Sequence, residues 1–267
     1  MNRERIRFDS VSVTFETADG PLAVVDDVSF SIADGEFVSV VGPSGCGKTT
    51  MMNIVAGFVK PTSGSVTLDG APIGGPGPER GVMFQEYGVF PWLTVEQNIA
   101  FGLGLKANRA LRPRTGEIVA KYLRLMGLEA FAHAFPRTLS GGMRQRLAIA
   151  RAYAVQPAFL LMDEPFGALD AQTRANMQDL LLEVLAAEGK TVMLITHSVE
   201  EAIYLSSRVL VVTARPARIA EIVEIPFGYP RREDLHESAE FNELRSHLRQ
   251  RVMQEYDAQQ RQARARA

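Results

Sequence analysis

One glycine-rich segment constrains the fold of this chain more than any other feature. Residues 42–49 read GPSGCGKT and fit the pattern of a glycine, four residues, then Gly-Lys-Thr. The apolar run Phe37–Val41 precedes the segment, and residues with helical spacing follow it as far as Gly57. A chance match in a chain of this length has odds on the order of one in a hundred. The segment therefore predicts a phosphate-binding loop between a strand and a helix.

The residue types in this loop suit the phosphates of a nucleotide. Glycines let successive backbone N–H groups converge on phosphate oxygens, and the helix that follows directs its positive end toward them. Lys48 would neutralise the outer phosphates, and the hydroxyl of Thr49 would bind Mg²⁺. The alternative is an ordinary glycine turn. We expect MgATP to be held by Gly42, Pro43, Ser44, Gly45, Cys46, Gly47, Lys48 and Thr49.

Two carboxylates follow another apolar run. Residues 159–162 are apolar and lead directly into Asp163 and Glu164. Ligands gather at strand ends in α/β sheets, so Asp163 is placed to bind Mg²⁺. Glu164 would polarise the attacking water, a general-base role worth typically about 10² to 10⁴ in rate. Two acids after a strand are often only a solvated strand end, but a phosphate loop in the same chain favours the catalytic interpretation.

A Ser-Gly-Gly turn opens a later helix. Ser140 is a credible N-cap for a helix that continues to Val155, and by itself this would be a simple helix start. Ser140, Gly141 and Gly142 also present backbone N–H groups and a hydroxyl, which together make a second anion-binding surface. The sequence therefore predicts two phosphate-binding surfaces in one chain.

Hydrophobic patterns predict strands of two kinds. Apolar residues alternate over 6–15 and again over 28–32, around a turn at 19–20, which indicates an antiparallel region. Further buried strands are expected at 158–162, 191–195 and 209–213. Because these strands alternate with helical stretches, they favour a parallel sheet.

Helix signals replace strand signals between about 86 and 155. Helices are expected at 95–105, 116–126 and 141–155, whereas the glycines and prolines of 74–78 indicate a loop. The predicted class is α/β: a P-loop NTPase core with a parallel sheet, an N-terminal antiparallel β subdomain and a helical subdomain insert.

Composition excludes several classes of protein. The formal net charge of -2 and pI near 6.1 show no basic footprint, so we expect no nucleic-acid partner. The single cysteine, Cys46, allows no intramolecular disulfide and fits a reducing compartment. No stretch approaches the roughly 18 to 20 apolar residues of a membrane span, and the start, MNRERIRF, lacks an apolar signal core. The sequence therefore favours a soluble or peripherally attached chain.

Together with Gln85, the Gly-Ala-Leu-Asp turn at 167–170 and His197, these motifs resemble those of ABC transporter ATP-binding subunits. Every signature stands in the family's order, and the resemblance extends from Phe8 to about Ile225. Particular similarity to the nitrate, sulfonate and taurine importer branch lies in the segments MFQEYGVFPWLTVEQNIAFGL, LLMDEPFGALDAQTR and LSSRVLVVTARPARI.

The resemblance implies an ABC ATP-binding domain at 1–230, with the helical insert at about 86–155. Residues 231–267 would form a polar helical extension, for which a solvated helix is favoured over a membrane-surface patch. In the family, ATP is clamped in a head-to-tail homodimer between 42–50 of one subunit, which adds Thr50, and 140–142 of the other. The dimer would lie at the cytoplasmic face of the membrane beneath multi-span permease subunits, supplied indirectly by an extracytoplasmic solute-binding protein.

The resemblance also implies roles for single residues. Phe15 would stack on adenine, and Gln85 would contact Mg²⁺ and sense the γ-phosphate. Asp170 would cross the dimer, and His197 would hold the γ-phosphate. A strand-core position for Phe15 and structural positions for the other three are the alternatives. Met143 stands where many relatives have glutamine, so we assign it no hydrogen bond to ribose.

An aromatic segment and two other function classes complete the expectations. Residues 87–92, YGVFPW, would receive a short helix of the membrane subunit, and ordinary core packing is the alternative. A soluble ABC ATPase acting on DNA or ribosomes is disfavoured by the single phosphate loop and short insert. A phosphotransferase such as a small kinase leaves the Ser-Gly-Gly helix, Gln85 and His197 unexplained.

Overall fold

The computed structural model of the chain describes residues 3–84, 88–232 and 234–266. These residues form two compact units. The first unit combines the chain up to Gly77 with the chain from Thr191 onward, and the second runs from Pro78 to Lys190. The second unit extends beyond the helical insert expected at about 86–155, because two strands and a long helix group with the insert's own helices.

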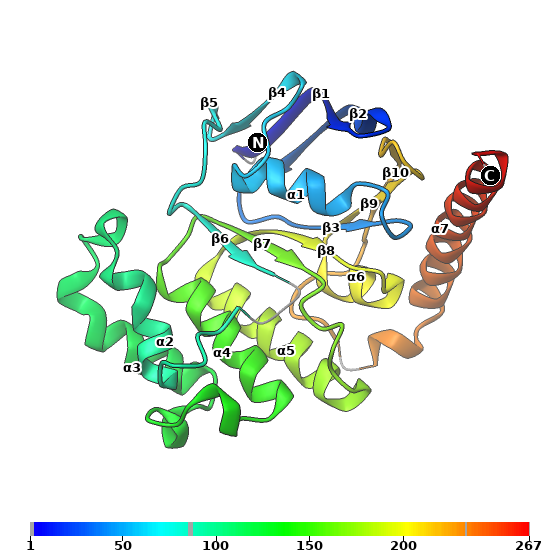
Figure 1. Cartoon of the computed structure of the whole chain (residues 1–267). Helices are drawn as coiled ribbons and strands as arrows, with labels where there is room; N and C mark the ends of the chain where they lie inside the picture. The colour runs from blue at the N-terminus through cyan, green and yellow to red at the C-terminus, as the bar shows by residue number, and fades with distance from the viewer. Residues whose placement is uncertain (1–2, 85–87, 233, 267) are drawn as a thin grey trace. The chain divides into compact units, whose positions relative to one another are not determined.

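An antiparallel sheet opens the first unit (Figure 1). It contains β1 (Glu4–Thr17), β2 (Gly20–Ala33), β4 (Ser63–Leu68) and β5 (Ala71–Pro72), in the order β2-β1-β4-β5. β1 and β2 pair around the expected turn, with Thr17 opposite Gly20. Phe8 of β1 stacks on Phe30 of β2, with 4.4 Å between the ring centroids. The predicted N-terminal antiparallel region is therefore confirmed.

The parallel strands of the first unit carry the glycine loop. β3 (Phe37–Val41) lies between β8 (Thr191–Ile195) and β9 (Arg208–Val212) and is parallel to both, while β10 (Ile219–Glu224) is antiparallel to β9. Every residue of β3 and β8 is buried, as expected for strands covered on both faces. In Figure 1, α1 (Lys48–Ala56) lies between the antiparallel sheet and β3. The predicted order of strand, glycine loop and helix is confirmed.

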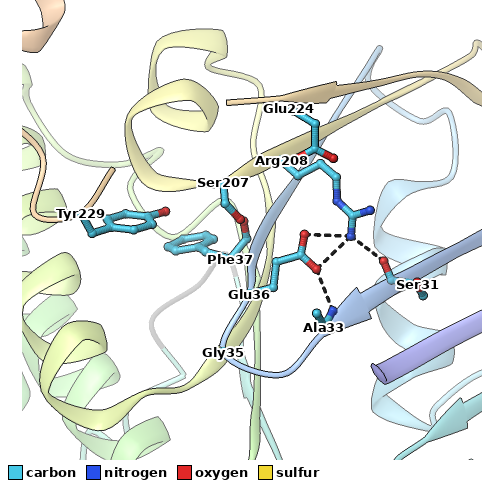
Figure 2. Close-up of a pocket in the computed structure, with 9 residues that line it drawn as sticks. All are labelled: Ser31, Ala33, Gly35, Glu36, Phe37, Ser207, Arg208, Glu224 and Tyr229. Carbon is cyan, nitrogen blue, oxygen red and sulfur yellow. Dashed lines mark hydrogen bonds and ion pairs between the residues drawn. The ribbon is translucent and has the colours of Figure 1, made fainter. Parts of the chain in front are cut away.

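A half-buried arginine ties the start of β9 to β2 and β3 (Figure 2). Arg208 donates from Nη2 to the carbonyl of Ser31 at 2.6 Å and to Oε2 of Glu36 at 2.9 Å. The carboxylate of Glu36 also accepts a hydrogen bond from the backbone N–H of Ala33 at 2.7 Å. Three chain segments are thus joined at the end of the sheet opposite the glycine loop.

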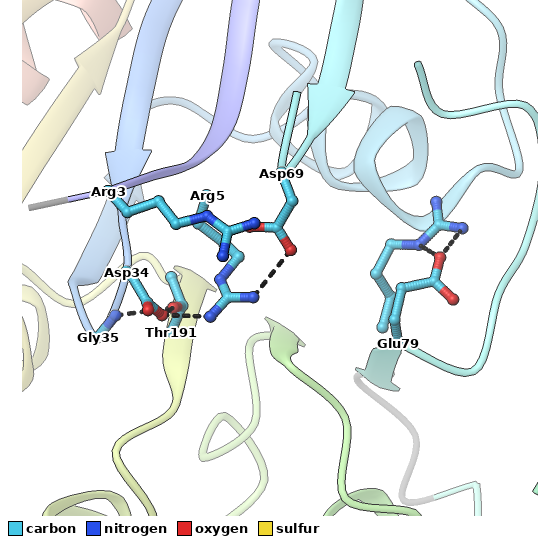
Figure 3. A network of polar contacts seen from close by, with 8 residues as sticks. Arg3, Arg5, Asp34, Gly35, Asp69, Glu79 and Thr191 are labelled. Carbon is cyan, nitrogen blue, oxygen red and sulfur yellow. Dashed lines mark hydrogen bonds and ion pairs between the residues drawn. The ribbon is translucent and has the colours of Figure 1, made fainter. Parts of the chain in front are cut away.

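A second arginine ties β1 to the turns that follow β2 and β4 (Figure 3). Arg5 pairs with Asp34 and donates from Nη1 to Oδ2 of Asp69 at 2.9 Å. The neighbouring Gly35 donates its backbone N–H to Oγ1 of Thr191 at 2.9 Å. Since Thr191 begins β8, this network links the antiparallel sheet to the parallel strands of the same unit.

The second unit joins parallel strands to a group of helices (Figure 1). β6 (Arg80–Met83) is parallel to β7 (Phe159–Asp163). The α-helices are α2 (Val95–Phe101), α3 (Thr115–Leu125), α4 (Gly141–Ala154) and α5 (Ala171–Glu188). The helix expected at 95–105 ends earlier, at Phe101, and continues as a 3-10 turn over Gly102–Gly104, because glycine is a poor helix former. The parallel pairs in both units confirm the predicted α/β class.

The C-terminal helix belongs to the first unit and is more closely packed than expected. α7 (Ala239–Arg266) buries Phe241 and Leu248 completely and packs against α6 (Val199–Leu205) and β9. The expectation of a solvated helix was wrong for this part of the helix, because two apolar residues seven positions apart share one face and anchor it. Among the described residues, no helix is both long and apolar enough to cross a bilayer.

Candidate active site

The backbone of the phosphate loop, residues 42–49, is shaped by glycine. Gly47 has φ +128°, and a Cβ at this position would lie 2.7 Å from the carbonyl oxygen of Val24. Residues with a side chain rarely adopt such a φ, and the contact with Val24 would leave no room for a Cβ atom. Gly45 also has positive φ, at +71°. Alternating backbone conformations of this kind turn successive N–H groups toward one side, which is the geometry of an anion-binding nest.

The side-chain ammonium of Lys48 donates hydrogen bonds to the backbone of the phosphate loop. Its side chain is buried, and Nζ donates to the carbonyls of Gly42 at 2.9 Å and Pro43 at 2.8 Å. These bonds use two of the three donors of the ammonium group. Ser44 and Gly45 are exposed, so the tip of the loop is accessible to a ligand. The structure thus places a cation and an exposed nest in one short segment.

The two threonines at the end of the loop are at least partly accessible, whereas the cysteine is not. Thr49 is exposed on the first turn of α1, and Thr50, the residue after the loop, is half-buried. Cys46 is fully buried, and burial raises the pKa of its thiol. Cys46 therefore contributes packing and backbone rather than a reactive sulfur.

The two carboxylates at the end of β7 differ in backbone conformation. Asp163 is the last residue of the strand and is buried, with 9% of its surface exposed. Glu164 follows with φ +47°, in the left-handed region, and its carbonyl accepts a hydrogen bond from Gly167 N–H at 3.2 Å. A non-glycine residue in this region is uncommon, and such strain is concentrated at functional sites. Sequence patterns gave no signal for this turn.

The Ser-Gly-Gly turn, residues 140–142, begins α4 as predicted. The hydroxyl of Ser140 accepts a hydrogen bond from the backbone N–H of Met143 at 3.2 Å, which confirms the N-cap. Ser140 is exposed, whereas Gly141 and Gly142 are half-buried. A Cβ on Gly142 would lie 2.7 Å from Cγ2 of Thr173. A Cβ at position 142 would therefore force Thr173 or the turn to shift.

Thr173 connects the turn to Asp170, a link that sequence reasoning missed. Asp170 is the N-cap of α5 and accepts hydrogen bonds from the backbone N–H of Thr173 at 2.9 Å and from its hydroxyl at 2.8 Å. These bonds lower the pKa of Asp170. Asp170 therefore caps α5, and it is also exposed to solvent. The methyl group of Thr173 also limits the size of the residue at position 142.

Of the three remaining candidates, Phe15 and His197 belong to the described part of the chain. Phe15 is 40% exposed on β1, so the strand-core alternative is wrong and the ring is accessible for stacking. His197 is exposed between β8 and α6. Ser198 caps α6 by accepting a hydrogen bond from Glu201 N–H at 3.2 Å, which fixes the backbone next to His197. Gln85 lies outside the described residues.

An exposed aromatic loop precedes α2 in the second unit. Trp92 is 70% exposed, and its ring centroid lies 5.5 Å from that of Phe90. The guanidinium of Arg151 lies 4.3 Å from the Phe90 ring centroid. Buried Asn98 holds the loop by accepting from the N–H of Phe90 at 2.8 Å and donating to carbonyls of the loop. Beside it is a cavity of about 240 Å³, lined in part by Phe84, Phe101 and Arg151.

Comparisons with known proteins show which family the chain resembles. A protein-family model described as ABC transporter matches residues 25–167. The chain is 44% identical over 248 residues to the nitrate import ATP-binding protein of Synechococcus elongatus, covering 92% of this chain and 90% of that one. It is 47% identical over 220 residues to the taurine import ATP-binding protein of Pelagibacter ubique, covering 82% of each.

A solved structure gives a similar fold. It is a dimeric ATP-binding cassette in a post-hydrolysis state, bound to ADP and Pi, with a TM-score of 0.70 and 29% sequence identity. The similarity covers 84% of this chain and all of that one.

Proposed function

This chain belongs to the ABC transporter family, as an ATP-hydrolysing subunit, and we propose that it powers solute import through a separate membrane permease. One observation carries the proposal. A single chain contains two helix N-termini suited to phosphate, at α1 and at α4. In a head-to-tail homodimer, residues 42–50 of one subunit and 140–142 of the other would together hold each ATP.

The phosphate loop is the proposed primary ATP site. Its nest, the buried cation of Lys48 and the exposed tip support this assignment. Phe15, with an exposed ring, is the proposed platform for adenine. Ser140 of the second subunit would add a hydroxyl to the phosphates, and Met143 is given no role toward ribose.

Oxygen donors in the chain fit Mg²⁺. Thr49 offers an exposed hydroxyl, and Asp163 offers a carboxylate at a strand end. Mg²⁺ prefers oxygen ligands, and in nucleotide sites it is held by one or two carboxylates together with phosphates and water. Thr49, Asp163 and Gln85 are the proposed ligands, and the ion would neutralise charge that develops on the phosphates.

Glu164 is the proposed general base. Its left-handed φ takes Glu164 out of the extended line of β7, so its carboxylate would be directed differently from that of Asp163. It would accept a proton from the attacking water while His197 and Gln85 contact the γ-phosphate. Asp170 is the proposed residue that crosses the dimer.

The aromatic loop is the proposed docking surface for the permease. Trp92 is too exposed for a core role, and Asn98 holds the loop beside the cavity next to Phe101. Exposed aromatic residues beside a hollow suit a partner's helix. Because Gln85 precedes this loop, a change at the γ-phosphate would be passed to the permease. The subunit would thus lie at the cytoplasmic face of the membrane.

The proposed solute is a small anion such as nitrate, a sulfonate or taurine. Similarity to the import proteins for nitrate and taurine supports this class. An ATP-binding subunit need not contact the solute. In the proposed importer, an extracytoplasmic binding protein would supply the solute to the permease.

Gentle affinity purification from solubilised membranes, followed by mass spectrometry, tests the transport role. We expect a multi-span membrane protein in near-equal amount. A Trp92→Ala variant should lose this partner but keep ATP hydrolysis, and Phe131→Ala, at another exposed aromatic of the same unit, is the matched control. Recovery with ribosomal or DNA-associated proteins alone would overturn the transport role while leaving the ATPase in place.

Glu164→Gln tests the hydrolytic role. We expect turnover to fall at least about a hundredfold while ATP binding stays intact, because the amide cannot accept the proton. The variant should also trap an ATP-bound dimer, measured by gel filtration with MgATP. Undiminished steady-state hydrolysis would remove Glu164 from the role of base.

A further inference from the structure

The C-terminal helix α7 carries a stripe of polar residues that faces the rest of the first unit. The stripe consists of His247, Arg251, Glu255 and Gln259, which follow one another at intervals of four residues. Residues four apart lie on one face of a helix, about one turn above each other. The stripe therefore runs along α7 for three turns.

Each member of the stripe contacts a different point of the same unit. His247 and Arg251 both contact the carboxylate of Glu221 on β10, each at 2.7 Å. One turn further along, Oε2 of Glu255 accepts a hydrogen bond from the backbone N–H of Ala214 at 3.2 Å. The contacts thus advance along the unit from the edge strand β10 to the turn after β9.

The last member of the stripe reaches the phosphate loop. Nε2 of Gln259 donates to the backbone carbonyl of Ser44 at 2.9 Å. A carbonyl oxygen only accepts, so this contact requires the donor of the amide. Gln259 is half-buried, whereas its neighbour Gln260 is exposed. A segment more than two hundred positions away in sequence thus contacts the loop.

We propose that α7 holds the phosphate loop in its binding conformation, with Gln259 as a positioning residue for nucleotide. The argument rests on the proposed ATP site at residues 42–49. In a trans peptide the C=O and N–H groups point in opposite directions. Fixing the carbonyl of Ser44 toward α7 therefore turns the N–H of Gly45 away from α7.

The same contact limits the freedom of the loop tip. Gly45 has φ +71° and no side chain, so its two neighbouring peptides rotate more easily than those of other residues. A hydrogen bond to one of these peptides reduces the number of loop conformations before ATP binds. Preorganisation of this kind raises affinity by lowering the ordering cost at binding.

Gln259→Met is the variant that tests the proposal, because it keeps side-chain length and helix propensity but removes the donor. We expect the Kd for ATP and the KM to rise by about two- to tenfold, the range of one modest hydrogen bond. The kcat at saturating ATP should stay at the wild-type value, since Gln259 contacts no reacting atom. Gln259→Lys, which keeps a donor, should restore most of the affinity.

The matched control is Gln260→Met, at the adjacent exposed position of the same helix. It should leave Kd, KM and kcat unchanged, and thermal unfolding should show that all three variants are folded. Equal ATP affinities for Gln259→Met and Gln260→Met would overturn the proposal. A fall in kcat without a change in KM would also overturn it.

Lys48→Ala separates this inference from the ATP site on which it rests. If Lys48→Ala weakens ATP binding and Gln259→Met does not, the phosphate loop stands and the role of α7 is wrong. If ATP affinity is unchanged in Lys48→Ala, the proposed ATP site itself fails.

Discussion

The phosphate loop and the Ser-Gly-Gly turn both begin helices, yet they are built differently. At α1 the N-cap is Gly47, which has no side chain to accept from the first-turn N–H groups. At α4 the N-cap is Ser140, whose hydroxyl accepts from Met143 N–H. The first four N–H groups of a helix need partners from outside its own ladder, and a side-chain cap supplies one of them.

This difference distinguishes two ways of preparing a phosphate site. The phosphate loop brings its own cation, Lys48, and a backbone that only glycine adopts at 47. The Ser-Gly-Gly turn has an exposed serine, a close contact with Thr173, and a cation, Arg144, that donates to the carbonyl of Leu139 before the turn. The first is equipped to bind nucleotide within one subunit. In the proposed dimer, the second would add to a site completed by another subunit.

The largest expected effect is at Gly47. In Gly47→Ala the new Cβ would clash with the carbonyl of Val24 at a φ that alanine avoids, so the loop must move. We expect ATP affinity to fall at least about tenfold, or about 1.4 kcal/mol, in a direct titration. The matched variant is Gly45→Ala, where φ is also positive but no described atom lies within 4 Å. Equal losses in both would break the argument for a loop shaped by the contact with Val24.

The next effect is at Gly142. Gly142→Ala would press a methyl group against Cγ2 of Thr173, and overpacking of this kind costs about 1–3 kcal/mol in the free energy of unfolding. Thr173→Ser removes that methyl and keeps the hydroxyl that bonds Asp170. The double variant should therefore recover stability in urea unfolding, and ATP affinity of the single subunit should stay constant throughout. Failure of Thr173→Ser to rescue would show that the contact does not require glycine.

Loss of the cap at Ser140 should have a smaller effect. Ser140→Ala removes the acceptor for Met143 N–H, which typically costs about 1 kcal/mol in the free energy of unfolding. Ser140→Thr keeps a hydroxyl and should lose less. Turnover by the dimer should fall in Ser140→Ala while ATP binding to the phosphate loop is kept. A parallel fall in ATP affinity would contradict the division between the two surfaces.

The smallest effect concerns pH. The hydrogen bonds from Thr173 lower the pKa of Asp170 from 3.8 in the folded chain. A lowered carboxyl pKa adds stability above the unfolded value, and that contribution is lost as pH falls through the folded value. The Tm difference between wild type and Asp170→Asn should therefore shrink as pH falls below 3.8. A Tm difference that stays the same at every pH would contradict the role of these two hydrogen bonds.

Much of the fold could be predicted because the sequence patterns that indicate it span only a few neighbouring residues. β8 occupies residues 191–195, as expected, since a short apolar run bounded by polar residues has few other ways to fold. The phosphate loop was readable because its glycines and lysine stand in a fixed order. The N-cap at Ser140 followed from the same kind of local pattern.

What could not be predicted depends on contacts between distant segments. The positive φ of Glu164 has no sequence signal, because glutamate gives no indication of a left-handed turn. The need for glycine at 142 depends on Thr173, and the contact of Gln259 with Ser44 joins two ends of the chain. β6 was missed because four residues give too short a pattern.

At Glu164, the stability of the folded chain and the proposed role in ATP hydrolysis favour different residues. A residue other than glycine at φ +47° raises the energy of the folded chain, since its Cβ crowds the backbone. Glu164→Gly would relieve this crowding and also remove the carboxylate. With Glu164 as the proposed general base, a screen of variants for heat resistance alone would favour a chain that binds ATP and no longer hydrolyses it. A thermostable form of this subunit should be selected by turnover as well as by melting temperature.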